Sequence, residues 1–78
     1  MAMLEAQRLT QLAIGHKATV RSVEAQGLTR RRLLDLGLVP GTTVEAVRHS
    51  PAGDPTAFLI RGSVIALRAS EANLIHIL

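Results

Sequence analysis

The sequence predicts a mainly β fold: a small antiparallel β-barrel of about five short strands with one short inserted α-helix. Three observations support this. The chain has 78 residues, about the length at which a single compact core can form. Short β-rich runs alternate with turn signals at short intervals, as in small barrels whose closure hides the sheet edges. A single stretch, Thr29 to Gly37, instead has the start and stop signals of a helix.

The first elements are expected in the N-terminal third. Residues 1–8 are predicted to be a flexible leader, so that the folded domain covers residues 9–78. The segment from Leu9 to Ile14 fits either an edge strand or a single turn, and the sequence does not separate the two. From Lys17 to Val23 polar and apolar residues alternate, which predicts a half-buried strand.

The predicted helix follows Gly27. Thr29 is expected to be its N-cap, with Leu28 before the cap and Leu33 at the fourth helical position forming a hydrophobic staple. Gly37 falls where a left-handed C-terminal cap is required. The apolar stripe expected to face the core consists of Leu33, Leu34 and Leu36.

A turn and a second strand are expected after the helix. Pro40 and Gly41 provide the fixed φ and the positive φ of the two central positions of a type II turn. The run Thr43–His49 predicts a strand with a bulge, because Val44 and Val47 would otherwise face opposite sides. The segment from residue 50 to residue 55 contains two prolines and a glycine and predicts an exposed loop.

A hairpin and a closing strand are expected in the remainder. The runs Thr56–Ile60 and Ser63–Ala69 are separated by Arg61-Gly62, which predicts a tight turn with glycine in the left-handed conformation. Residues 70–73 predict a capped helical turn. Residues 74–78 predict a last strand with His76 on the solvent face.

Composition excludes several classes of protein. The only aromatic residue is Phe58, so bases of a nucleic acid would find little to stack on. The chain has no cysteine, which excludes disulfides and thiol chemistry and fits a reducing compartment. No apolar run is long enough to span a bilayer, and the first residues lack the order of a secretion signal. A cytoplasmic protein is therefore expected.

The sequence gives little support for catalysis or for metal binding. His16, His49 and His76 lie in separate segments without ligand spacing, so no metal site is expected. No phosphate-binding loop or nucleophile motif is present, so neither a cofactor nor an enzymatic activity is expected. The carboxylates are single and dispersed, and none can be named as half of an acid/base pair: Glu5, Glu24, Asp35, Glu45, Asp54 and Glu71.

The net charge of +3 corresponds to the three positive charges of Arg30, Arg31 and Arg32, which lie at the start of the predicted helix. Cations in a first turn oppose the helix dipole at about 0.3–1 kcal/mol each, which indicates a role other than packing. One interpretation is a partner-binding site; the other is that the arginine stems cover apolar surface while their heads stay in water. Asp35 is spaced to pair with Arg31 or Arg32.

The ordered combination RRRLLDLGLVPGTTVEAV, PAGDP and RGSVIALRASEA resembles the FeoA family of bacterial ferrous iron uptake, from about Leu9 to Leu78. The resemblance implies an SH3-like barrel with a short helix inserted after the first strand. It also implies association with the cytoplasmic region of the FeoB transporter, and contact with the membrane only through that transporter. Ser63 stands where many relatives have a larger residue, and a related module occurs in iron-dependent repressors.

We therefore expect a cytoplasmic accessory or regulatory protein that docks the arginine helix and the following turn onto FeoB. The alternative is a free-standing nucleic-acid-binding or metal-responsive regulatory module, although no nucleic-acid partner is expected. An exposed strand edge could also form a weak homo-oligomer. The residues expected to bind the partner are Arg30, Arg31, Arg32, Asp35, Leu36, Gly37, Leu38, Pro40 and Gly41.

Overall fold

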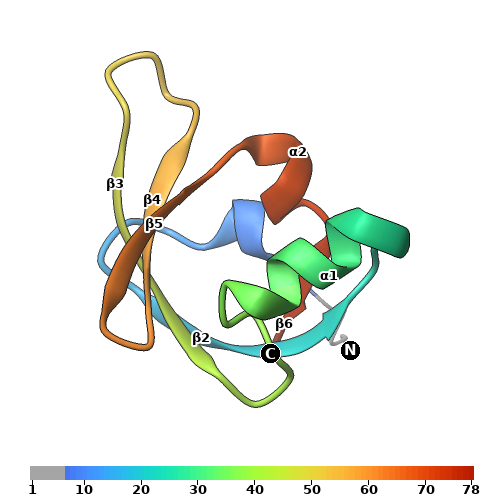
Figure 1. Ribbon diagram of the computed structural model, residues 1–78. Coiled ribbons are helices and arrows are strands. Elements are labelled where there is room, and N and C mark those ends of the chain that lie inside the picture. Colours follow the sequence, from blue (N-terminus) through green and yellow to red (C-terminus); the bar gives the residue numbers. More distant parts are fainter. Residues whose placement is uncertain (1–6) are drawn as a thin grey trace, which may run out of the picture.

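A computed structural model describes residues 7–78 of the chain (Figure 1). The predicted mainly β fold with an inserted helix is confirmed. In chain order the elements are strand β1 (Gln7–Arg8), the 3-10 helix η1 (Leu9–Gln11), β2 (Lys17–Val23), α1 (Gly27–Asp35), β3 (Thr43–His49), β4 (Thr56–Ile60), β5 (Ser63–Leu67), α2 (Ala69–Ala72) and β6 (Ile75–Ile77).

The start of the domain differs from the prediction. Gln7 and Arg8, assigned to the leader by the sequence, form β1 and pair with β6. The rest of the predicted leader lies outside the described residues. The segment after it, for which strand and turn were both open, is a turn: η1 buries Leu9 completely. The pairing of β1 with β6 extends the domain to the residues before Leu9.

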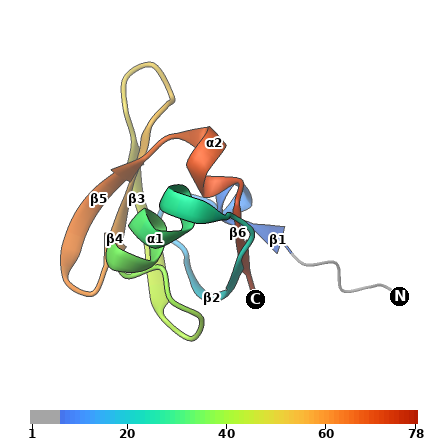
Figure 2. The same cartoon turned by 45° about the vertical axis from the view of Figure 1, so that its right-hand side comes forward.

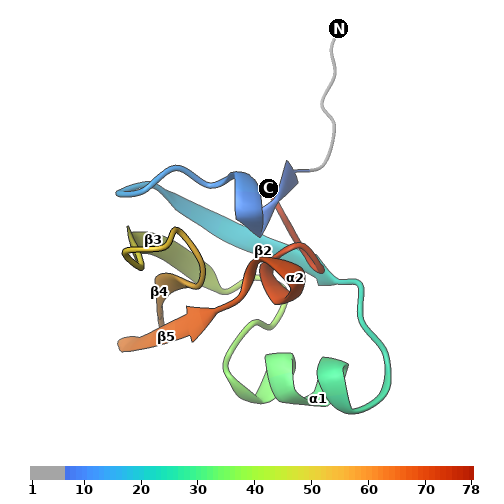
Figure 3. The same cartoon turned by 90° about the horizontal axis from the view of Figure 1, so that it is seen from above.

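The strands form a single antiparallel sheet in the order β1-β6-β2-β3-β4-β5. The sheet is strongly curved: seen from above, β3, β4 and β5 lie on one side, and β1 and β6 lie beyond β2 (Figure 3). The loop between β3 and β4 projects away from the rest of the molecule (Figure 2). Because β5 is at the end of the strand order, it is an edge strand.

Two irregularities set which side chains face inward. The register of β2 shifts between Val20 and Ser22, so that Val20 and Val23 are both buried. The bulge predicted in Thr43–His49 is confirmed by a register shift between Ala46 and Arg48. An extra residue on one strand reverses the side that later residues face, and this bends the strand toward closure.

The core is built almost entirely from aliphatic side chains, with Phe58 as the one aromatic member. Helix α1 contributes Leu33, and the segment after the helix contributes Leu38; both are fully buried. The buried apolar residues are Leu9, Val20, Val23, Leu33, Leu38, Val44, Ala46, Phe58, Ile60, Leu67, Ala72, Ile75 and Ile77. Burial of these side chains is the main force that holds the sheet and helices together.

The predicted hairpin is present, with both turn residues in the left-handed region: φ is 50° at Arg61 and 81° at Gly62. These values are typical of a two-residue type I′ turn. Strand β5 is two residues shorter than predicted. The reason is that Ala69 already begins α2, where its N–H donates to Asp54 Oδ1 at 2.8 Å.

Candidate functional site

The arginine triplet is not in the first turn of its helix. Helix α1 begins at Gly27 after Gln26, and Gly27 has a φ of 62° that turns the chain from β2 into the helix. The predicted N-cap, Thr29, and the staple of Leu28 on Leu33 are therefore wrong: Leu28 is 88% exposed. The arginines lie at the fourth to sixth helical positions, and Arg32 lies in the last turn, where the helix dipole favours a cation.

The end of α1 matches the prediction. The Leu38 N–H donates to the Leu33 carbonyl at 3.1 Å and the Gly37 N–H donates to the Leu34 carbonyl at 2.9 Å. This is the Schellman pattern, with Gly37 left-handed at a φ of 106°. The paired apolar contact of the motif comes from Leu33 and Leu38, both buried in the core.

The turn at Pro40-Gly41 is anchored to the sheet. The Thr42 N–H donates to the Val39 carbonyl at 3.0 Å, and Gly41 has a φ of 95°, which confirms the predicted type II turn. The Gly41 N–H donates to the Val20 carbonyl, and the Val20 N–H donates to the Thr42 carbonyl, both at 2.8 Å. The turn thereby holds the chain after α1 against the middle of β2.

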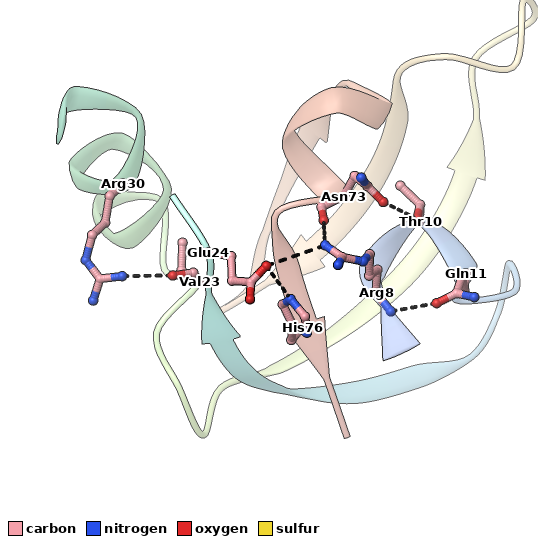
Figure 4. Close-up of polar contacts among 8 residues, drawn as sticks. All are labelled: Arg8, Thr10, Gln11, Val23, Glu24, Arg30, Asn73 and His76. Carbon is pink, nitrogen blue, oxygen red and sulfur yellow. Dashed lines mark hydrogen bonds and ion pairs between the residues drawn. The ribbon is translucent and has the colours of Figure 1, made fainter. Parts of the chain in front are cut away.

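Arg30 is bound within the protein. Its Nη1 donates to the carbonyl of Val23, at the end of β2, at 2.9 Å (Figure 4). The bond is partly buried and joins the start of the helix to the strand before it. Arg30 therefore positions α1.

Arg32 is also engaged, but not with the residue expected. It forms a hydrogen-bonded ion pair with Glu71 of α2, which connects the two helices. Within residues 7–78, Asp35 forms no ion pair with Arg31 or with Arg32. The predicted pairing with Asp35 is wrong, because the packing of α2 beside α1 brings a closer carboxylate to Arg32.

Arg31 is the member of the triplet that remains available. In the described part of the chain its side chain has no hydrogen bond and no ion pair, and the residue is exposed. Leu28 precedes it by three positions on the same side of the helix and is the most exposed large apolar residue of the structure. The outward face of α1, defined here by Leu28 and Arg31, thus combines a cation with an apolar side chain.

The other predicted site residues differ in their burial. Gly37 and Leu38 are buried, so they support the turn from inside and offer no side chain to a partner. Leu36 is half-buried, whereas Pro40 and Gly41 are exposed. The sequence reasoning missed Leu28, although any helix that contains both Leu28 and Arg31 places them on one side.

Arg61 was also missed. A Cβ added to Gly37 would lie 3.4 Å from Cδ of Arg61 and 2.9 Å from Cγ2 of Ile60. The aliphatic part of the Arg61 side chain therefore lies against the end of α1. Any residue larger than glycine at position 37 would overlap the side chain of Ile60. This contact brings a further arginine to the turn, and no local sequence signal announces it.

A second polar cluster lies on the other side of β2 (Figure 4). Glu24 Oε1 lies 2.9 Å from His76 Nε2 and 3.7 Å from Arg8 Nη1, and that Nη1 donates to the Asn73 carbonyl at 2.7 Å. The contact with His76, through hydrogen bonding and charge, lowers the pKa of Glu24, with a smaller contribution from Arg8. His76 faces away from the core as predicted, between Arg8 of β1 and Ser22 of β2, and its side chain is 14% exposed.

Within residues 7–78, no three His, Cys, Asp or Glu side chains are grouped so that they could hold a metal ion. In the same range, no helix is long and apolar enough to cross a membrane.

Solved structures of similar chains share this fold. A FeoA protein from Chlorobium tepidum has a TM-score of 0.82 and 42% identity, with 92% of this chain and 70% of that chain covered. FeoA of Stenotrophomonas maltophilia, solved with zinc and described as a prokaryotic SH3 domain protein, has a TM-score of 0.82 and 34% identity over 92% of this chain and 89% of that chain. A manganese-dependent transcriptional repressor at 15% identity and a TM-score of 0.83 shares the fold alone.

Sequence comparison gives the same result. A fusion protein of Fe(2+) transport protein A and the Fe(2+) transporter FeoB from Porphyromonas gingivalis is 34% identical over 70 residues. The match covers 90% of this chain but only 8% of the length of the fusion protein. The model of the FeoA domain matches residues 7–78, all of the described structure. With its sequence, its barrel and its inserted helix in agreement, the chain belongs to the FeoA family.

Proposed function

We propose that this protein is a non-enzymatic accessory subunit of ferrous iron uptake that binds the cytoplasmic region of a FeoB-type transporter. Support for this partner comes from the Porphyromonas gingivalis relative, in which the two parts are fused in one chain. The Stenotrophomonas maltophilia relative has itself been described as a candidate activating factor of ferrous iron transport. The protein then works in the cytoplasm and meets the membrane only through the transporter.

The observation that carries the docking proposal is the outward face of α1. Arg31 has no internal partner among the described residues, and Leu28 beside it is 88% exposed. Arginine beside an exposed apolar side chain is a combination enriched at protein interfaces. An acidic partner surface would neutralise Arg31 and cover Leu28 in one contact.

The neighbouring residues then have supporting roles. Arg30 and Arg32 hold α1 against β2 and α2 through their bonds to Val23 and Glu71. Gly37, Pro40 and Gly41 shape the turn after the helix. Asp35 and the half-buried Leu36 lie at the border of the outward face of α1. Arg61, in the hairpin turn, adds positive charge beside Gly37.

The test is a binding titration against the full-length FeoB-type transporter in a membrane mimic. Arg31→Glu is the informative variant, because it changes the outward face of α1 without breaking an internal contact of the described structure. Arg48→Glu on β3 is the matched control, since Arg48 is exposed and the charge change is identical. Arg32→Glu is unsuitable, because it would place a carboxylate against Glu71.

We expect Arg31→Glu to weaken binding by about tenfold or more, as reversal of an interface charge does. Its thermal stability should equal that of the wild type, and Arg48→Glu should bind normally. Equal losses in both variants would show that only the overall charge matters. Absence of binding by the folded wild type, with and without guanine nucleotide, would overturn the proposal.

A further inference from the structure

Strand β5 has a free backbone edge. It is the last strand of the sheet, and within residues 7–78 it pairs with β4 alone. The hairpin turn has two residues, so the pair next to it, Ile60 and Ser63, exchanges backbone hydrogen bonds. Because hydrogen-bonded and non-hydrogen-bonded pairs alternate, the N–H and C=O groups of Val64 and Ala66 point away from β4. These groups are the available hydrogen-bonding positions.

This edge lacks the features that normally protect edge strands. The residues from Ser63 to Leu67 include no charge and no proline, and Val64 is 55% exposed. Natural proteins usually place lysine, proline or a bulge on such an edge to prevent pairing with another chain. An open, uncharged edge of five residues is therefore a template for an added strand.

The charges at the two ends of β5 favour one kind of added strand. Arg61 precedes β5 and Arg68 follows it, and both are exposed. A second copy of this chain, paired antiparallel through the same edge, would bring the Arg61 of each copy close to the Arg68 of the other. A strand with a carboxylate at each end would instead meet a cation at each end. Charge complementarity thus favours an acidic peptide over self-pairing.

The surroundings of the edge also suit a peptide. A groove of about 530 Å³ crosses the outer face of the sheet from β3 and the loop after it to the edge strand, where Ala66 lines it; its other lining residues are Arg48, His49, Ser50, Pro51, Pro55 and Ala57. Side chains of an added strand that face this side could enter the groove, which is how added strands gain specificity. Figure 3 shows that the free edge of β5 faces the side of the molecule on which α1 lies.

We propose that the free edge of β5 binds an extended peptide segment of another protein by strand addition, with carboxylates flanking a short uncharged stretch. The main-chain bonds are made with Val64 and Ala66, and Arg61 and Arg68 receive the flanking carboxylates. The contacts of this surface include neither Leu28 nor Arg31, although Arg61 also lies beside the turn after α1. The inference does not depend on the identity of the partner of α1.

The test is an NMR titration of the full chain with the capped peptide Glu-Thr-Val-Thr-Val-Thr-Glu, whose carboxylates are spaced to reach both arginines. Backbone amides of Val64 and Ala66 should show the largest shifts and slower hydrogen exchange. The matched peptide with lysine in place of both glutamates should bind about tenfold more weakly, and added salt should reduce that difference.

Two variants separate backbone pairing from charge. Val64→Pro removes an outward N–H that β4 does not use and should weaken binding about fivefold, the value of one lost hydrogen bond. Arg61→Glu/Arg68→Glu keeps the backbone intact and should abolish the preference for the acidic peptide, which keeps the test valid if the proline variant does not fold. Arg31→Glu should bind the peptide as the wild type does, which separates this result from the docking of α1.

Three results would overturn the proposal. One is equal binding of the acidic and the lysine peptide. Another is peptide-induced shifts centred away from β5. The third is concentration-dependent shifts of Val64 and Ala66 without peptide, which would show that a second copy of this chain occupies the edge.

Discussion

The inward and outward sides of α1 are built from the same residue types but have different consequences. On the inward side, Leu33 is fully buried, Arg30 binds the end of β2 and Arg32 pairs with Glu71. On the outward side, Leu28 is exposed and Arg31 has no partner within residues 7–78. A run of arginines is therefore not a binding site in itself. The arginine without an internal partner in the described structure, Arg31, is the one that we propose binds another protein.

The largest expected difference between the two sides is in packing. Leu33→Ala should destabilise the domain by about 2–5 kcal/mol, because it leaves a cavity under the helix. Leu28→Ala should change stability by less than about 0.5 kcal/mol, because the side chain is in water already. Urea denaturation of both variants measures this directly. A large loss of stability in Leu28→Ala would mean that the outward side is also packed in solution.

The Arg32–Glu71 pair should give a smaller effect. The Arg32 side chain is 51% exposed, so solvent screens the pair and its coupling should be about 0.2–1 kcal/mol. A double-mutant cycle of Arg32→Ala and Glu71→Ala by urea denaturation measures this coupling. The same cycle with Arg31 in place of Arg32 should give no coupling. Coupling between Arg31 and Glu71 would contradict the division of the triplet.

The smallest effect concerns Glu24, which is exposed like Arg31 but has internal partners. The folded protein lowers the pKa of Glu24, so the ionised carboxylate contributes stability above the usual glutamate pKa of about 4.3. This contribution is lost as the pH falls through the lowered pKa. Glu24→Gln should therefore melt slightly below the wild type at about pH 6, and the difference should shrink as the pH falls through the lowered pKa of Glu24.

Thermal melting across this pH range tests the effect of Glu24, with Glu45→Gln as a control for the loss of one negative charge. A difference between wild type and Glu24→Gln that stays constant down to the most acidic pH would show that the contacts of Glu24 with His76 and Arg8 do not depend on its charge.

Many parts of the fold could be predicted from the sequence because their causes are local. The strands Lys17–Val23 and Thr43–His49 have the predicted bounds, since alternation and the mismatch between Val44 and Val47 are features of neighbouring residues. The left-handed cap at Gly37 and the type II turn at Pro40-Gly41 also depend on residues a few positions apart. The family resemblance extended this local information to the whole barrel.

The sequence by itself thus determined the class of fold, most strand positions, the helix with its terminating glycine, and the location of the excess positive charge. Only the tertiary structure decided where α1 begins and which arginine remains available. Glu71 lies 39 positions from Arg32, and the Val23 carbonyl meets Arg30 only because α1 folds back on β2. Pairings of this kind depend on how elements pack, and three adjacent arginines are locally equivalent until that packing gives two of them partners.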